Sequence, residues 1–214
     1  MTTDSRVLDV GCGDGHTLIN LSNLYQEGIG IDESAYIIEK ASHAAAEAAI
    51  NNVQFLRESA INLPFDNHSF DFIFSERGPL GLGDETLAEA TRVLKPGGRI
   101  FIETMGSYFM QEYKSPDEPP SQDTLLTTLD VERERFRRFG IEPTILMSQT
   151  STLQFESLYD WFANHCAIER YFENSLTEQS DETFIQSFVE NASDEAGRLN
   201  LTEHLIWMGG VLGQ

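Results

Sequence analysis

Basic residues are scarce in this chain of 214 residues, where 14 Lys and Arg stand against 35 Asp and Glu for a formal net charge of −21. Proteins bind nucleic acids largely through Lys and Arg contacts with phosphates, so this balance disfavours RNA or DNA as a partner. The one basic cluster, Arg133 to Arg138, alternates with Glu132 and Glu134, which is typical of a solvated amphipathic helix. Such acidity suits a small neutral or cationic ligand, or simply favours solubility.

Cysteines and long apolar runs are also scarce. Cys12 and Cys166 are the only cysteines, and their spacing forms no metal-ligand or redox motif. The five histidines are scattered, so no metal site is predicted. No signal peptide is visible, and no apolar stretch reaches the ~18 residues that a membrane span requires. We therefore expect a cytoplasmic protein without a membrane partner.

The first half of the chain alternates short apolar runs with helical periodicity, which predicts βαβ units and a parallel sheet with helices on both faces. The predicted strands are Arg6–Val10, Gly28–Asp32, Val53–Leu56, Phe70–Ser75 and Arg99–Glu103. The predicted helices are Thr17–Leu24, Ser34–Ile50 and Asp84–Leu94. The last of these helices should stop at Lys95-Pro96-Gly97-Gly98, because proline and paired glycines disfavour its continuation.

The second half is less regular, and we expect the whole chain, residues 1–214, to form one domain. Gly106–Asp130 is polar and contains several prolines, which predicts a long loop or a poorly ordered segment. A short helix is predicted at Val131–Phe139, ended by Gly140. The remaining predicted elements are strands at Thr144–Leu153 and Leu201–Met208 and helices at Glu156–Cys166 and Glu182–Asn191.

The strongest motif is the sequence VLDVGCGDG at Val7–Gly15, where a strand runs into a glycine-rich turn that opens a helix. Glycine allows a tight turn and a close approach of a ligand to the backbone, and a helix N-terminus offers free N–H groups. Dinucleotide-binding folds use a related G-x-G-x-x-G string. Here His16 stands where the third glycine of that string should be, which argues against NAD or FAD.

Three further features follow this turn in order: Asp32 at the end of the second strand, ESAINLPFDNHSFD at Glu58–Asp71, and RVLKPGGRIFIE at Arg92–Glu103. Together the set resembles class I S-adenosylmethionine-dependent methyltransferases, most closely the branch that includes ubiquinone and menaquinone methyltransferases. The resemblance implies a Rossmann-like, doubly wound α/β fold with a mostly parallel seven-stranded sheet. It also implies that residues 1–104 bind the cofactor and that residues 105–214 complete the sheet and supply the acceptor site.

The resemblance assigns roles to individual residues of the site. Asp9 matches the acid that meets the methionine amino group, although it could instead cap the following turn. Asp32 matches the acid that binds the ribose hydroxyls, although it could instead cap the helix near Ser34. The other residues implied to line the cofactor site are Gly11, Cys12 and Gly13 beneath methionine and ribose, Glu33, Ser59 and Ala60 at adenine, and Ser75 near the reacting methyl group. Cys12 is interpreted as a small packing residue of the turn rather than a nucleophile.

Two features depart from the family pattern. Ser59 stands where the family usually has an aspartate, and a serine accepts a hydrogen bond from adenine more weakly than a carboxylate. Family members also carry helices before the glycine turn, whereas this turn begins within the first ten residues. We expect the cofactor to be covered by an N-terminal segment missing from a truncated start, by the C-terminal half, or by a partner chain, and a homodimer is one option. Tyr108, Phe109 and Tyr113 are candidates for the acceptor pocket.

The predicted activity is therefore methyl transfer from S-adenosylmethionine to an acceptor that the sequence does not identify. A small-molecule acceptor is favoured, because the acidic charge opposes RNA. A general base is needed only if the acceptor must lose a proton, and Glu76 is the candidate. The alternatives are a methyltransferase acting on a protein or RNA, and a non-catalytic module that binds the cofactor or a partner.

Overall fold

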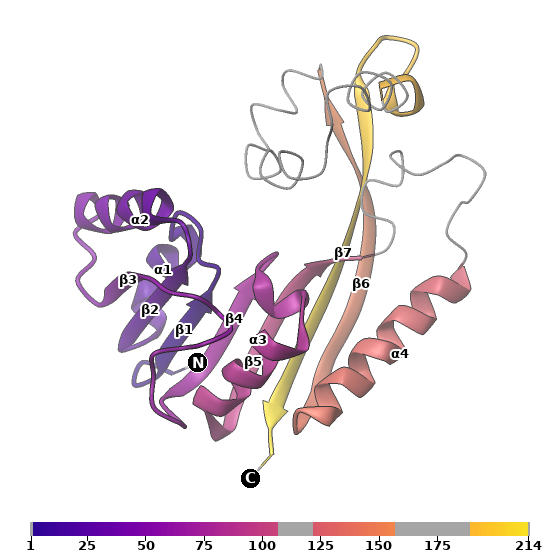
Figure 1. Cartoon of the computed structure of the whole chain (residues 1–214). Coiled ribbons are helices and arrows are strands. Elements are labelled where there is room, and N and C mark those ends of the chain that lie inside the picture. The colour runs from indigo at the N-terminus through magenta and orange to yellow at the C-terminus, as the bar shows by residue number, and fades with distance from the viewer. Residues whose placement is uncertain (1, 107–121, 157–188, 214) are drawn as a thin grey trace. The chain divides into compact units, whose positions relative to one another are not determined.

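The computed structural model of the chain describes residues 2–106, 122–156 and 189–213 (Figure 1). These residues divide into two compact units. Unit 1 comprises residues 1–105, 127–148 and 206–214, and it contains every residue predicted from the sequence to bind the cofactor. Of the described residues, unit 2 comprises 106, 122–126, 149–156 and 189–205. The expectation of one domain over the whole chain stays a prediction.

A seven-stranded sheet in the order β3-β2-β1-β4-β5-β7-β6 is the framework of the fold. Neighbouring strands from β3 to β5 pair in parallel, and β6 and β7 run in opposite directions (Figure 1). This confirms the prediction of a mostly parallel, Rossmann-like sheet of seven strands. Strand order reverses beside β1, which pairs with β2 on one side and β4 on the other. In open α/β sheets, ligands bind beyond the carboxyl ends of the strands at such a reversal.

The first five strands lie where the apolar runs predict them, with small shifts at their ends. Their bounds are β1 Arg6–Val10, β2 Glu27–Asp32, β3 Val53–Arg57, β4 Phe70–Glu76 and β5 Leu94–Met105. The largest difference is in β5, which begins five residues before Arg99. Leu94 pairs with Phe70, and a register irregularity follows before Phe72 pairs with Arg99. The Lys95–Gly98 turn is thus taken up as a bulge inside the strand.

Helices α2, Ala35–Glu47, and α3, Asp84–Val93, confirm the predicted pattern. Ser34 caps α2, because its side chain accepts a hydrogen bond from the backbone N–H of Ile37. The predicted helix over Thr17–Leu24 is interrupted. It consists of α1, His16–Asn20, and a 3₁₀ turn, η1, at Ser22–Leu24. Asn20, Ser22 and Asn23 at this joint have low helix propensity, which favours a break there.

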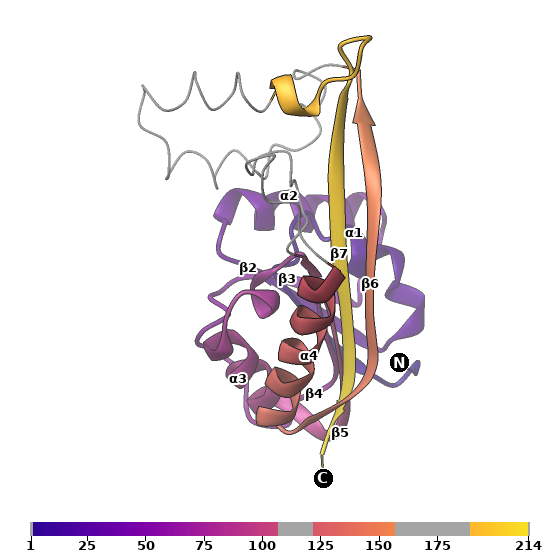
Figure 2. The same cartoon turned by 90° about the vertical axis from the view of Figure 1, so that its right-hand side faces the viewer.

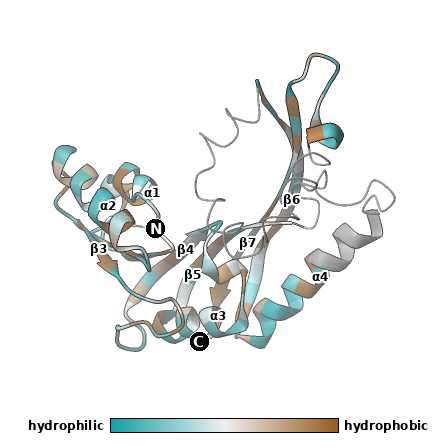
Figure 3. Ribbon diagram, turned by 45° about the horizontal axis from the view of Figure 1, so that its top comes forward, coloured by the Kyte–Doolittle hydropathy of each residue, from teal (hydrophilic) through white to brown (hydrophobic). Residues whose placement is uncertain are grey.

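Two hydrophobic clusters lie on opposite faces of the sheet, as alternate residues of each strand require. On one face, Val7 and Phe74 pack with Leu18 of α1 and with Ala41 and Ala45 of α2. The other face carries Leu8 and Ile73 with α3 and α4 (Figures 1 and 2). In Figure 3, α2 alternates between hydrophilic and hydrophobic residues, as an amphipathic helix should when only one side of it is buried. The predicted coverage of both faces by helices is confirmed.

The C-terminal elements are longer than the sequence predicts. Helix α4 spans Gln122–Arg138, so the predicted loop over Gly106–Asp130 is wrong from Gln122 onward. Strand β6 spans Ile141–Phe155 and β7 spans Leu199–Leu212. Residues 189–192 are helical. The rest of the helix predicted at Glu182–Asn191 lies outside the described residues. The helix predicted at Glu156–Cys166 also lies outside them, apart from Glu156. The candidates Tyr108, Phe109 and Tyr113 also lie outside them.

Candidate functional site

The glycine-rich turn after β1 is built from backbone conformations that favour glycine. Gly11, Gly13 and Gly15 have φ of 80°, 53° and 77°. The N–H groups of Gly11 and Cys12 both donate to the carbonyl oxygen of Ile31, at 2.9 Å each. These two bonds hold the turn against the end of β2, at the point where strand order reverses.

Each glycine of this turn has a different neighbourhood. A Cβ atom on Gly11 would lie 2.6 Å from Cδ of Pro79, and one on Gly15 would lie 2.6 Å from Cε1 of Phe55. A Cβ on Gly13 would meet nothing within 4 Å among the residues that the structure describes. Gly11 and Gly15 are therefore required for packing, whereas Gly13 faces open space where a ligand could approach the backbone.

Asp9, near the end of β1, is a buried ionisable group of the site. Its side chain is 3% exposed, and its carboxylate accepts no hydrogen bond from the residues that the structure describes. Burial raises the pKa of Asp9 well above its ordinary value, and the negative charges of Glu76 and Asp32 raise it further. A buried carboxylate in this state is stabilised by a positively charged group placed against it.

Asp32 ends β2 and connects two neighbouring loops. One carboxylate oxygen, Oδ2, accepts a hydrogen bond from the N–H of Gly13 at 3.4 Å. The other, Oδ1, accepts from the N–H of Ser34 at 2.9 Å, directly before α2. Asp32 thus binds the N–H of Ser34, the residue that caps α2, and also lies beside Gly13.

Glu33 and Ser59 join the ends of β2 and β3. The Ser59 hydroxyl donates to Oε1 of Glu33 at 2.7 Å, and Nε of Arg57 donates to the Glu33 carbonyl oxygen at 3.0 Å. Ala60, the next residue, is buried in the core. Ser59, which stands where the family resemblance implies an aspartate, thus lies against the carboxylate of Glu33, directly after β2. Sequence spacing alone does not reveal this contact.

Ser75 and Glu76, at the end of β4, differ in exposure. Ser75 is fully buried, and its hydroxyl donates to the carbonyl oxygen of Val10 at 2.6 Å, which fastens β4 to β1. Glu76 is exposed, and its Oε2 accepts a hydrogen bond from the Thr17 hydroxyl at 2.9 Å. Thr17, on α1, was not predicted as a site residue, since only the fold brings it to Glu76. The remaining site residue, Cys12, has a buried thiol whose pKa burial raises above its ordinary value, so the thiolate is disfavoured.

The edge formed by the ends of β1, β2, β3 and β4 thus brings together two pairs of predicted residues, Asp32 with Gly13 and Glu33 with Ser59. Four carboxylates lie at or directly after the ends of β1, β2 and β4: Asp9, Asp32, Glu33 and Glu76. Within the described residues, no group of three or more His, Cys, Asp or Glu side chains could hold a metal ion. Among those same residues, no helix is long and apolar enough to cross a membrane.

A family model described as methyltransferase domain matches residues 2–179. The chain belongs to this family. An uncharacterised methyltransferase, YcgJ of Bacillus subtilis, is 28% identical over 197 residues, which cover 90% of this chain and 74% of that protein. A demethylmenaquinone methyltransferase of Staphylococcus saprophyticus is 37% identical over 101 residues, 45% of this chain and 42% of the relative. The aligned segment therefore covers less than half of the length of that second relative.

Solved structures agree on the fold. The crystal structure of YcgJ has a TM-score of 0.68 and 22% identity, covering all of this chain and 94% of the other. A phosphoethanolamine N-methyltransferase of Haemonchus contortus, solved with S-adenosylmethionine, has a TM-score of 0.60 and 17% identity, covering all of this chain and 50% of the other. The chain is a methyltransferase, and its sequence motifs predict S-adenosylmethionine as the cofactor.

The residues present fit this cofactor. Its methionine part carries an ammonium group, and the buried carboxylate of Asp9 lacks a partner among the described residues. Its ribose requires hydrogen-bond acceptors, and Asp32 lies beside the open space at Gly13. The individual roles of Asp9, Gly11, Cys12, Gly13, Asp32, Glu33, Ser59, Ala60, Ser75 and Glu76 stay predictions.

Proposed function

We propose that this methyltransferase transfers the methyl group of S-adenosylmethionine to a small neutral or cationic molecule. The observation that carries the proposal is the concentration of carboxylates at the carboxyl edge of the sheet in a chain of net charge −21. A field of this sign attracts cationic and tolerates neutral acceptors, and it repels the phosphates of a nucleic acid. A structural neighbour of low identity, the Haemonchus enzyme, was solved with phosphomonomethylethanolamine. This ligand carries a phosphate as well as an amine, so it supports the small size of the acceptor and not its charge.

In this proposal, Asp9 receives the ammonium group of the cofactor and Asp32 receives the ribose hydroxyls. Glu33, Ser59 and Ala60 form the adenine edge. Bound S-adenosylmethionine supplies a methyl group on a sulfonium centre, which is a good leaving group. The protein contributes mainly by holding donor and acceptor in line.

Glu76 is the proposed general base where the acceptor must lose a proton. It is exposed at the end of β4, and the Thr17 hydroxyl at 2.9 Å fixes the direction of its carboxylate. A base removes a proton from the acceptor during methyl transfer only if its carboxylate lies within hydrogen-bond reach of that proton. Acceptors that are already nucleophilic would not depend on Glu76.

The test is formation of S-adenosylhomocysteine with a panel of small phenols, amines and thiols, and separately with RNA and with a protein mixture. We expect turnover with at least one small molecule and none with RNA. For a phenol acceptor, Glu76→Gln should lower kcat by about 10²-fold or more. The matched control is Glu47→Gln. Glu47 is an exposed glutamate of α2 that pairs with His43 and with no other residue that the structure describes, so this variant should retain full activity.

Two outcomes would overturn the proposal. Turnover with RNA alone or protein alone would assign a macromolecular acceptor. Cofactor binding without turnover on any acceptor would favour the non-catalytic alternative.

A further inference from the structure

The segment between β3 and β4, residues 58–69, contains no helix or strand, yet it carries Ser59 and Ala60. A segment of this kind needs side chains to hold it, because its backbone N–H and C=O groups are not paired within a helix or a sheet. Two of its apolar residues supply part of the anchoring, since Ala60 and Leu63 are 7% and 3% exposed in the core. The polar anchor comes from α3.

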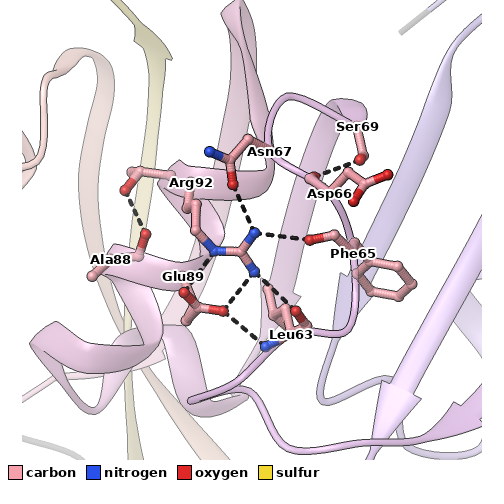
Figure 4. A network of polar contacts seen from close by, with 9 residues as sticks. Leu63, Phe65, Asp66, Asn67, Ser69, Ala88, Glu89 and Arg92 are labelled. Carbon is pink, nitrogen blue, oxygen red and sulfur yellow. Dashed lines mark hydrogen bonds and ion pairs between the residues drawn. The ribbon is translucent and has the colours of Figure 1, made fainter.

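Arg92, near the end of α3, directs every N–H of its guanidinium at a defined acceptor (Figure 4). Nη1 donates to the Phe65 carbonyl oxygen at 2.8 Å and to Oδ1 of Asn67 at 2.9 Å. Nη2 donates to the Leu63 carbonyl oxygen at 2.9 Å and to Oε2 of Glu89 at 2.7 Å. Nε donates to Oε1 of Glu89 at 2.8 Å. A guanidinium has five N–H groups, and all five are used here.

Glu89 lies one turn before Arg92 on the same helix, and together the two residues form a clamp on the segment 58–69. Its Oε2 also accepts a hydrogen bond from the Leu63 N–H at 2.8 Å. The hydrogen bond from Arg92 is the main reason that the pKa of Glu89 lies below its ordinary value, with the Leu63 N–H adding to it. Leu63 is therefore held through both its N–H and its carbonyl group.

The distance along the chain from this anchor to the predicted adenine edge is short. The N–H of Asn62 donates to the Ser59 carbonyl oxygen at 3.3 Å, so Ser59 to Leu63 form a compact turn. Ser59 is fixed at its other end by the hydrogen bond from its hydroxyl to Glu33. Movement at Leu63 would therefore be transmitted to Ser59 through about one turn of chain.

We propose that Arg92, supported by Glu89, is a positioning residue of the cofactor site that fixes the Ser59–Ala60 turn against the end of β2. The inference rests on the proposed assignment of Ser59 and Ala60 to the adenine edge. Arg92 itself touches no ligand in this account. Arg92 holds the adenine edge in its binding conformation before the cofactor binds. Binding therefore does not lose free energy in ordering this segment.

The test compares Arg92→Lys with Lys95→Met by calorimetry. Lysine retains the charge but cannot reproduce the planar set of five donors. Lys95 is a matched control, because its ammonium pairs with Asp71 at 2.7 Å close to the end of α3, and its side chain makes no hydrogen bond or ion pair with residues 58–69. The probes are S-adenosylhomocysteine and S-inosylhomocysteine, which has an oxygen in place of the adenine 6-amino group.

We expect the wild-type chain to bind S-adenosylhomocysteine more tightly than its inosine analogue. Arg92→Lys should weaken S-adenosylhomocysteine by about tenfold and the analogue by less, so that the ratio of the two affinities falls toward one. Lys95→Met should keep the wild-type ratio even if it unfolds at a lower temperature, because lost stability alone does not change discrimination between purines.

A folded Arg92→Lys variant with the wild-type ratio would overturn the positioning role. Asp32→Ala separates this failure from failure of the site itself. If Asp32→Ala loses binding while Arg92→Lys keeps the wild-type ratio, the cofactor site stands and only the clamp is rejected. If Asp32→Ala binds like the wild-type chain, the assignment of the site is wrong and the inference falls with it.

Discussion

At the scale of single residues, Asp9 shows how a buried charge can be unfavourable for the fold and useful for binding. Its pKa is raised mainly by burial, and then by the nearby charges of Glu76 and Asp32. The folded state therefore holds the Asp9 proton more tightly than the unfolded state does. This contribution to stability is complete below the ordinary aspartate pKa and is lost as the pH rises through the raised value.

Asp9→Asn should remove this pH-dependent loss. At neutral pH we expect the variant to be more stable than the wild-type chain by about 1–3 kcal/mol, because an amide has no buried charge. The difference should vanish toward acidic pH, where Asp9 is protonated in both states. Urea unfolding of both proteins across a pH series measures it, and parallel stability curves would contradict the account. The variant should also bind S-adenosylhomocysteine more weakly.

The open space at Gly13 gives a second residue-scale prediction. Gly13 and Gly97 both have positive φ, 53° and 77°, and a Cβ on either would meet nothing within 4 Å among the described residues. Alanine at either position should therefore cost about 1–2 kcal/mol of backbone strain. Only Gly13→Ala should also weaken cofactor binding, because only Gly13 lies at the proposed site. Thermal unfolding and calorimetry of both variants would test this, and equal effects on binding would argue against it.

At the scale of elements, the sequence predicted the first half of the fold well and the site only in outline. Strands β1 to β5 are apolar runs bounded by turn residues, so local pattern defines them. The start of α4 was missed, because residues 115–121 are rich in proline and polar residues and obscure the helix that follows at Gln122. The pairing of Ser59 with Glu33 and the burial of Asp9 depend on which strands become neighbours, and no local pattern encodes that.

Arg135 joins α4 to the segment after β4. The side chain is 8% exposed, and Nε donates to Oδ1 of Asp84 at 3.0 Å. Nη2 donates to the Leu80 carbonyl oxygen at 3.1 Å and also to that of Gly83. The basic cluster that the sequence predicts to be a solvated helix face therefore contains one buried residue, Arg135. The periodicity of the sequence alone does not show which arginine turns inward.

Arg135→Met should lower the free energy of unfolding by about 3 kcal/mol, because it leaves buried carbonyl groups without their donor. The matched control is Arg137→Met on the same helix, where the exposed arginine pairs only with Glu134 at 2.8 Å. That substitution should cost less than about 1 kcal/mol. Denaturant unfolding of the two variants measures both values. Similar small losses would mean that Arg135 does not hold α4 in place.

At the scale of the whole molecule, the net charge of −21 acts on both stability and partner choice. Like charges repel one another in the compact state, and salt screens this repulsion. The Debye length falls from about 30 Å at 0.01 M salt to about 8 Å at 0.15 M. The unfolding midpoint should therefore rise over this range of sodium chloride. A falling midpoint would show that favourable ion pairs outweigh the repulsion.

The central claim is that the carboxyl edge of β1, β2, β3 and β4 binds S-adenosylmethionine through Asp9 and Asp32. Calorimetric titration of the wild-type chain and of Asp32→Ala with S-adenosylmethionine and S-adenosylhomocysteine tests it most directly. The account predicts micromolar binding of both ligands to the wild-type chain and loss of binding in the folded variant, because the ribose loses its acceptor (a micromolar Kd corresponds to about −8 kcal/mol). Undiminished binding by Asp32→Ala, or no binding by the folded wild-type chain, would contradict it.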